Sequence, residues 1–220
     1  MTRPLVSELT IIEAVKRGDK ILQIPKEAII TDAARDRAKQ SGIKIMVQTA
    51  PPESRAESKK TTSIGGPELV VCLGSDHGGY RLKETLKPFI EGLGCKVVDL
   101  GTYSEESCDY PDFAYAVART VSLGDAARGI MVDSVGLASA IVANKVRGIR
   151  ATCCFDEYSA RSSREHNNAN VLTLGGKTIG VELAKAIVKT WLETPFGGGR
   201  HQKRIDKIAE IEKRAGNNVS

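Results

Sequence analysis

The chain has 220 residues, a formal net charge of +5 and 41% hydrophobic residues, a composition that excludes a fibrous or wholly disordered protein. Its basic residues are spread along the chain and aromatic residues make up only 5%, so nucleic-acid binding is not expected. No apolar run approaches the ~18 residues that span a bilayer, and the N-terminus lacks a secretory signal pattern, so we expect a cytoplasmic protein with no membrane association.

Residues 1–48 predict a small αβ appendage with alternating helices and strands. The predicted elements are a helix capped by Ser7, a strand at 21–24, a helix at 32–41 between Thr31 and Gly42, and a strand at 43–47. The first helix is predicted to carry an apolar stripe at Leu9, Ile12 and Val15. So short a piece buries little core by itself, and we expect it to dock on something.

Residues 49–67 are rich in Pro, Ser, Lys, Glu and Gly and predict a flexible linker before a domain at 68–220. Strands are predicted at 69–74, 95–101, 129–133, 148–154 and 170–175. Helices are predicted at 80–93, from a cap at Asp109 with Pro111 in the first turn, and near 137–146, 156–165 and 178–192. Pro88 predicts a kink or an early end of the first of these helices. This alternation indicates an α/β fold in which helices cover both faces of a parallel sheet.

Polar residues follow two of the predicted strands, where open parallel sheets bind ligands. Asp76 and His77 follow the first strand, and Asp133 ends the third strand before Ser134 and Gly136. A carboxylate beside an imidazole binds sugar hydroxyls and moves protons, and backbone N–H groups at a helix start stabilise oxyanions. The alternative is that both aspartates only cap the helices that follow them.

Two further segments concentrate polar side chains. His166 and Asn167 lie in SREHNNAN, which we expect to be a polar loop before the fifth strand, and Arg200, His201 and Arg204 lie in GGGRHQKR. Arginine forks bind phosphate, although turn chemistry and a solvated helix face explain such segments equally well. All three histidines fall in these candidate segments. The set of acids, bases and anion donors predicts proton transfer next to the carbonyl of a phosphorylated sugar, with no metal or cofactor.

The motifs SDHGGYRLKE, GTYSEESCDYPDFA, ANKVRGIRA, SREHNNANVL and GGRHQKR, in this order, resemble the ribose-5-phosphate isomerase B and galactose-6-phosphate isomerase family over about residues 69–214. The resemblance implies a Rossmann-like three-layer α/β/α sandwich that forms homodimers, often tetramers, with active sites between subunits. It implies substrate binding by Asp76, His77 and Asn167, ring opening by His166, and phosphate binding by Arg200 and Arg204, with Arg200 or His201 reaching the neighbouring subunit's site.

The loop after the third strand departs from the family pattern. Many members carry a Cys base where Asp133 stands, others carry a Glu base where Ser139 stands, and SVGLA replaces a glycine-rich loop. The Asp-containing loop is similar to that of the A subunit of galactose-6-phosphate isomerase, which works with a Cys-bearing subunit. Three hypotheses follow: a self-sufficient isomerase with Asp133 as base, a subunit that needs a Cys-bearing paralogue, and a sugar-phosphate-binding protein without turnover.

The exact sugar depends on pocket geometry; ribose 5-phosphate is the first expectation and galactose 6-phosphate the second. The appendage resembles N-terminal segments of enzymes associated with bacterial microcompartments. This resemblance implies that residues 9–15 recruit the protein to a shell or cargo protein. A small domain-stabilising extension is the alternative.

Overall fold

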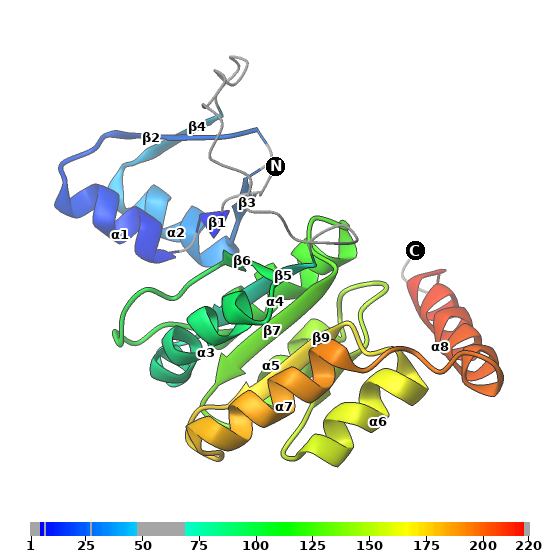
Figure 1. The fold of residues 1–220 in the computed structure, drawn as a ribbon. Coiled ribbons are helices and arrows are strands. Elements are labelled where there is room, and N and C mark those ends of the chain that lie inside the picture. The colour runs from blue at the N-terminus through cyan, green and yellow to red at the C-terminus, as the bar shows by residue number, and fades with distance from the viewer. Residues whose placement is uncertain (1–4, 7, 27, 48–68, 218–220) are drawn as a thin grey trace, which may run out of the picture. The chain divides into compact units, whose positions relative to one another are not determined.

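The computed structural model describes residues 5–6, 8–26, 28–47 and 69–217 (Figure 1). The chain divides into two compact units, residues 1–68 and 69–220, and each is described by itself. The predicted cap Ser7 and the predicted linker at 49–67 lie outside the described residues.

The N-terminal unit contains two helices and four short strands. Its elements are β1 (Leu5–Val6), α1 (Glu8–Lys16), β2 (Ile21–Ile24), β3 (Ile29–Ile30), α2 (Asp32–Ser41) and β4 (Lys44–Val47). β1 pairs in parallel with β3, and β2 pairs in parallel with β4. The predicted helices and strands are confirmed, whereas β1 and β3 are additions, because strands of two residues show no periodicity.

This unit has its own small core. Thr31 caps α2 by accepting a hydrogen bond from the Ala34 amide, at 3.1 Å. The buried apolar residues are Val6, Ile11, Ala14, Ile24, Ala34, Ala38 and Ile43. The predicted stripe on α1 is wrong at Val15, which is 44% exposed, since Ile11 and Ala14 form the buried face. A shift of one position turns the face of a helix by about 100°.

The C-terminal unit is a single parallel sheet of five strands in the order β6-β5-β7-β9-β8. Its strands are β5 (Val70–Ser75), β6 (Lys96–Asp99), β7 (Arg128–Asp133), β8 (Ala151–Cys153) and β9 (Val171–Gly175). Its helices are α3 (Tyr80–Gly92), α4 (Tyr110–Ser122), α5 (Leu137–Ala143), α6 (Glu157–Asn167), α7 (Val181–Glu193) and α8 (Arg200–Asn217). All pairings are parallel, as the continuous apolar strands predicted.

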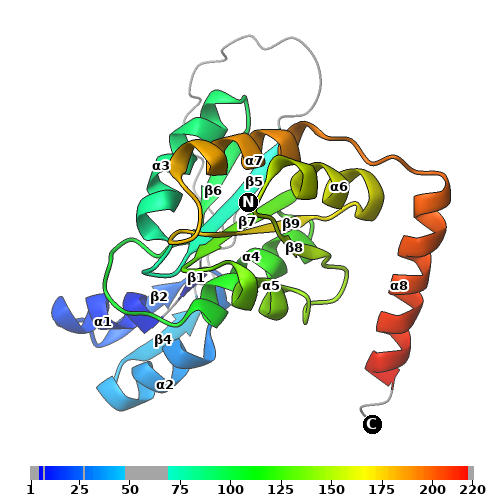
Figure 2. The ribbon, with the colours of Figure 1, turned by 90° about the horizontal axis from the view of Figure 1, so that it is seen from below.

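Helices cover both faces of this sheet. Figure 2 shows α3, α7 and α6 over one face and α4 and α5 over the other, so the predicted three-layer α/β/α sandwich is confirmed. The core between the sheet and the first group of helices includes Leu73, Ile130, Leu172, Ile187 and Trp191. α8 extends away from the sheet and, within its own chain, packs on α6.

One helix keeps its predicted length despite a proline, and another runs further than predicted. α3 continues through Pro88 to Gly92, so the early end is wrong; Leu82, Leu86 and Ile90 keep its apolar face on the core across the proline. α6 continues to Asn167 and ends at Asn168.

The chain leaves the paired strands β5 and β7 in opposite directions, toward β6 on one side and toward β8 and β9 on the other. This makes their carboxyl ends a topological switch point, where open α/β sheets bind ligands.

Candidate functional site

Asp76 lies at the switch point, directly after β5, and is 5% exposed. Its Oδ1 accepts a hydrogen bond from the Gly79 amide at 2.9 Å, so Asp76 holds the turn that leads into α3. Burial raises the pKa of Asp76; the Asp133 carboxylate also raises it, while the Gly79 amide and His77 oppose the shift. Asp76 therefore binds the turn before α3 without capping the helix, whose N-cap is Gly79, and lies near a second carboxylate.

His77 is held by the loop between β6 and α4. The backbone N–H and C=O of Cys108 both lie 3.2 Å from His77 Nδ1, and Cys108 Sγ lies 4.0 Å from the same atom. Burial raises the pKa of the Cys108 thiol. Cys108 therefore supports the imidazole mainly through its backbone.

Asp133 ends β7 and its carboxylate is enclosed by the loop that follows. Oδ1 accepts hydrogen bonds from the amides of Val135, at 2.7 Å, and Gly136. Oδ2 accepts hydrogen bonds from the Ser139 amide, at 3.1 Å, and from the Ser139 hydroxyl. A carboxylate offers about four acceptor positions, so these donors engage all of them. The Asp133 carboxylate is therefore held on both oxygens by its own loop.

The turn before α3 and the loop after β7 pack tightly against each other. A Cβ on Gly79 would lie 2.1 Å from the Val132 carbonyl oxygen, and one on Gly78 would lie 2.2 Å from Ser134 Oγ. Only glycine allows this approach. It brings the predicted residues Asp76, His77, Asp133, Ser134 and Gly136 to one edge of the sheet, although the Gly136 amide points at Asp133.

His166 and Asn167 lie in the last turn of α6, so the prediction of a polar loop is wrong. Asn168 ends the helix with φ 46°, a left-handed conformation that asparagine tolerates, which lets the helix include both residues. Ser162 Oγ lies 3.1 Å from His166 Nδ1.

Arg200, His201 and Arg204 lie at the start of α8, after a segment in which Gly198 and Gly199 have positive φ. The His201 ring stacks on His166 with centroids 4.4 Å apart and planes 14° apart. Burial, His166 and the two arginines lower the pKa of His201. The structure therefore joins the HNN and RHQKR segments into one group.

The two groups lie at opposite edges of the sheet. Asp133 lies at the carboxyl end of β7. α6 begins after the carboxyl end of β8 and runs back along the sheet, so His166 lies near the amino end of β9. The length of β9 separates these edges by about 17 Å. One chain therefore brings its predicted site residues together as two half-sites.

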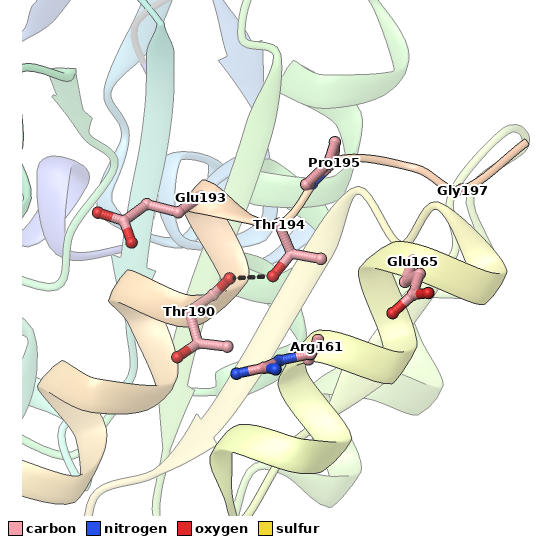
Figure 3. A pocket seen from close by; sticks show the side chains of 7 residues that line it. All are labelled: Arg161, Glu165, Thr190, Glu193, Thr194, Pro195 and Gly197. Carbon is pink, nitrogen blue, oxygen red and sulfur yellow. Dashed lines mark hydrogen bonds between the residues drawn. The ribbon is translucent and has the colours of Figure 1, made fainter.

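A pocket of about 470 Å³ lies elsewhere, between α6, α7 and the segment after α7. Figure 3 shows Arg161 and Glu165 on one side and Thr190 and Glu193 on the other. None of the predicted site residues lines it. Within the described ranges, no cluster of three or more His, Cys, Asp or Glu side chains is arranged to hold a metal, and every helix is too short or too polar to traverse a lipid bilayer.

A sequence profile described as "Ribose/Galactose Isomerase" matches residues 71–208, which contain both half-sites. The chain belongs to this family. It is 44% identical to ribose-5-phosphate isomerase B of Escherichia coli, over 66% of this chain and 97% of the relative. It is 40% identical to galactose-6-phosphate isomerase subunit LacA of Streptococcus mutans, over 65% and 99%.

Solved family structures agree with the fold. The structure of ribose-5-phosphate isomerase B from Clostridium thermocellum matches with a TM-score of 0.66 and 50% identity, covering 67% of this chain and 99% of that one. The family profile begins at residue 71, so the N-terminal unit is an addition to it. The chain is thus a family member of the sugar-phosphate aldose–ketose isomerase class.

Arg150 and Arg164 were not among the predicted site residues. Both stand inside the family motifs, but neither lies beside a predicted strand end at the ligand-binding edge. The structure places both guanidinium groups against the end of α6, next to His166.

Proposed function

We propose that the protein interconverts ribose 5-phosphate and ribulose 5-phosphate by proton transfer through an enediolate. The observation that supports this most directly is the buried pair of Asp76 and Asp133 at the switch point of a chain 44% identical to a ribose-5-phosphate isomerase B. Two adjacent carboxylates whose environments differ suit acid–base work on a sugar. Galactose 6-phosphate is the second candidate substrate, suggested by the LacA relative.

The proposed roles follow the positions in the fold. Asp133 is the base, and the Ser139 hydroxyl is the donor that can rotate away to release an oxygen for the proton. His166 assists ring opening. The remaining proposed substrate-binding groups are Asp76, His77, Ser134, Gly136, Asn167, Arg200, His201 and Arg204, with both arginines on the phosphate.

We propose that the working unit is a homodimer or tetramer. A two-fold axis that brings the carboxyl edge of one subunit to the His166–His201 group of another joins the two half-sites, which one chain keeps about 17 Å apart. Exposed apolar side chains support such a contact. They are Leu137 and Ile141 on α5 and Ile208 and Ile211 on α8.

The hydrogen bonds of Asp133 favour a second candidate. If its carboxylate never leaves the loop, the protein supplies His166 and the arginines to a paralogous subunit that carries the Cys base. Co-purification of such a subunit would support this arrangement. Binding without turnover is the third candidate, and its mark is tight sugar-phosphate binding without proton exchange.

The deciding experiment is NMR of the purified protein in deuterated buffer with ribose 5-phosphate and then hexose 6-phosphates. Deuterium incorporation at C2 that is abolished in both Asp133→Asn and His166→Ala supports the proposed isomerase. Exchange that persists in Asp133→Asn rules out Asp133 as the base. No exchange with any sugar, in a folded oligomer, rules out the self-sufficient enzyme.

We also propose a cytoplasmic location within a bacterial microcompartment, where the appendage binds a shell or cargo protein. Support is limited to the pattern of α1, on which Val15 is exposed. Deletion of residues 1–60 should release the protein from the compartment fraction. Unchanged partitioning would leave the appendage as a stabilising extension.

A further inference from the structure

Two arginines converge on the end of α6. Arg150 stands directly before β8 and Arg164 lies in α6 itself, one turn before its end. Arg164 is 2% exposed and its guanidinium faces the Trp191 ring at 5.7 Å. Neither arginine has a role in the proposed mechanism, and neither lies beside Asp76 and Asp133 at the carboxyl ends of the strands.

Both guanidinium groups bind the residues that directly follow His166. Arg150 Nε donates to the carbonyl oxygens of Asn167, at 3.0 Å, and Asn168, at 3.2 Å, and its Nη2 donates to the latter at 3.0 Å. Arg164 Nη1 donates to Asn168 Oδ1 at 2.8 Å and to the Ala169 carbonyl oxygen at 2.6 Å. The last carbonyls of a helix have no partner within it, and these bonds supply partners here.

The arrangement is electrostatically costly. Burial, together with the like charges of Arg128 and Arg150, lowers the pKa of Arg164 to about 10. Among the described residues neither Arg150 nor Arg164 forms a salt bridge within 4.0 Å; both donate to neutral oxygens near the negative end of the α6 dipole, and the Glu212 carboxylate partly offsets the lowering of the Arg150 pKa by burial. The hydrogen bonds from the two arginines fix the conformation of residues 167–169.

That conformation determines where the His166 ring lies. The ring is in the last turn, where a helix end otherwise frays, and its side-chain contacts include Ser162 Oγ at Nδ1, Glu165 Oε1 at 4.0 Å from Nε2, and the stack on His201. We infer that Arg150 and Arg164 are positioning residues that hold His166 in place for the substrate bound at a neighbouring subunit. This inference rests on the proposed role of His166 in ring opening.

The test separates positioning from general stability. Arg150→Lys keeps the charge but loses the Nε and Nη2 fork that binds two carbonyls. Arg164→Met keeps the length of the buried side chain and removes the Nη1 donor. Asn168→Gly keeps a residue that accepts positive φ and removes only the Oδ1 acceptor. Arg161→Lys, on the exposed side of the same helix, is the matched control.

Two readouts are needed. The first is the imidazole ¹⁵N spectrum of His166, which reports ring environment and tautomer without requiring activity. The second is the exchange rate on ribose 5-phosphate, whose furanose must open, beside that on erythrose 4-phosphate, whose phosphorylated terminal oxygen prevents such a ring. If the ring-opening group is displaced, the exchange rate falls on ribose 5-phosphate and is unchanged on erythrose 4-phosphate. A general loss of structure lowers both rates.

We expect Arg150→Lys, Arg164→Met and Asn168→Gly to shift the His166 signals and to lower kcat on ribose 5-phosphate by about 10- to 100-fold, with Arg161→Lys unchanged. Unaltered His166 signals in folded Arg150→Lys and Asn168→Gly would overturn the inference, as would equal losses on both sugars. If wild type turns over neither sugar, the proposed function fails, while the His166 signals still decide whether the arginines position the ring.

Discussion

The two half-sites are built in different ways. At the carboxyl edge, Asp76 and Asp133 are held by amides no more than six residues away in their own loops. At the amino edge, His166 and His201 come from separate helices and stack on each other, and Arg150 binds the carbonyl oxygens of Asn167 and Asn168 that follow His166. The first half is fixed by local hydrogen bonds, and the second depends on how α6, α8 and the sheet edge pack together.

The difference teaches that the first half is set within single loops, whereas the second depends on contacts between separate elements. Loop amides and close backbone packing leave no room near Gly79, whereas the stack on His201 is held beside the glycine segment at 197–199. A site that joins both through a subunit contact would combine a rigid acid–base centre with a group that another subunit supplies.

The largest effect on activity should come from placing a defect in each half-site on a different chain. Asp133→Asn and His166→Ala should each be inactive alone. When the two are unfolded, mixed and refolded together, activity should return to about a quarter of wild type, because half of the dimers are mixed and one of their two sites is intact. No recovery in verified mixed dimers would show that one chain supplies the whole site.

The rigid half is tested by Gly79→Ala. The new Cβ would lie 2.1 Å from the Val132 backbone oxygen, so we expect a loss of about 3 kcal/mol in the free energy of unfolding. Gly92→Ala, which meets no atom within 4 Å, should stay within about 1 kcal/mol of wild type. Urea denaturation of both variants gives the comparison, and equal stabilities would contradict the packing described for this turn.

The contact that would join the His166–His201 group to another subunit is tested through α8. Ile208 is 49% and Ile211 is 64% exposed, and the proposed dimer covers them. Ile208→Glu with Ile211→Glu should therefore raise the dimer dissociation constant by at least about tenfold, since buried charges are disfavoured. Analytical ultracentrifugation measures this change; an unaltered constant would place the contact elsewhere. Lys207→Glu on the same helix is the control.

The smallest effect should be a pH dependence from His201. Its pKa is lowered below the ordinary 6.5, so the unfolded chain binds more protons than the folded one as pH falls through 6.5. The stabilisation by the histidine stack should therefore be present above this pH and decrease below it. Thermal unfolding between pH 5 and 8 measures the slope, and His201→Phe should flatten it while keeping a ring on His166.

Much of the fold could be predicted from the sequence. Continuous apolar runs such as that at 69–74 indicated buried parallel strands, and Thr31 and Gly42 indicated the ends of a helix. The failures have physical causes. The apolar face of α3 overrides the proline at position 88, and Asn168 takes the left-handed conformation that glycine usually supplies, so α6 absorbs His166.

The sequence by itself determined the family, the parallel α/β architecture and the identity of the polar residues, because these depend on local patterns and ordered motifs. Only the tertiary structure decided that Asp133 is enclosed by its own loop, that His166 meets His201, and that the two half-sites lie at opposite edges of the sheet. Such facts depend on side-chain directions and on contacts between segments distant in the chain, which no local pattern records.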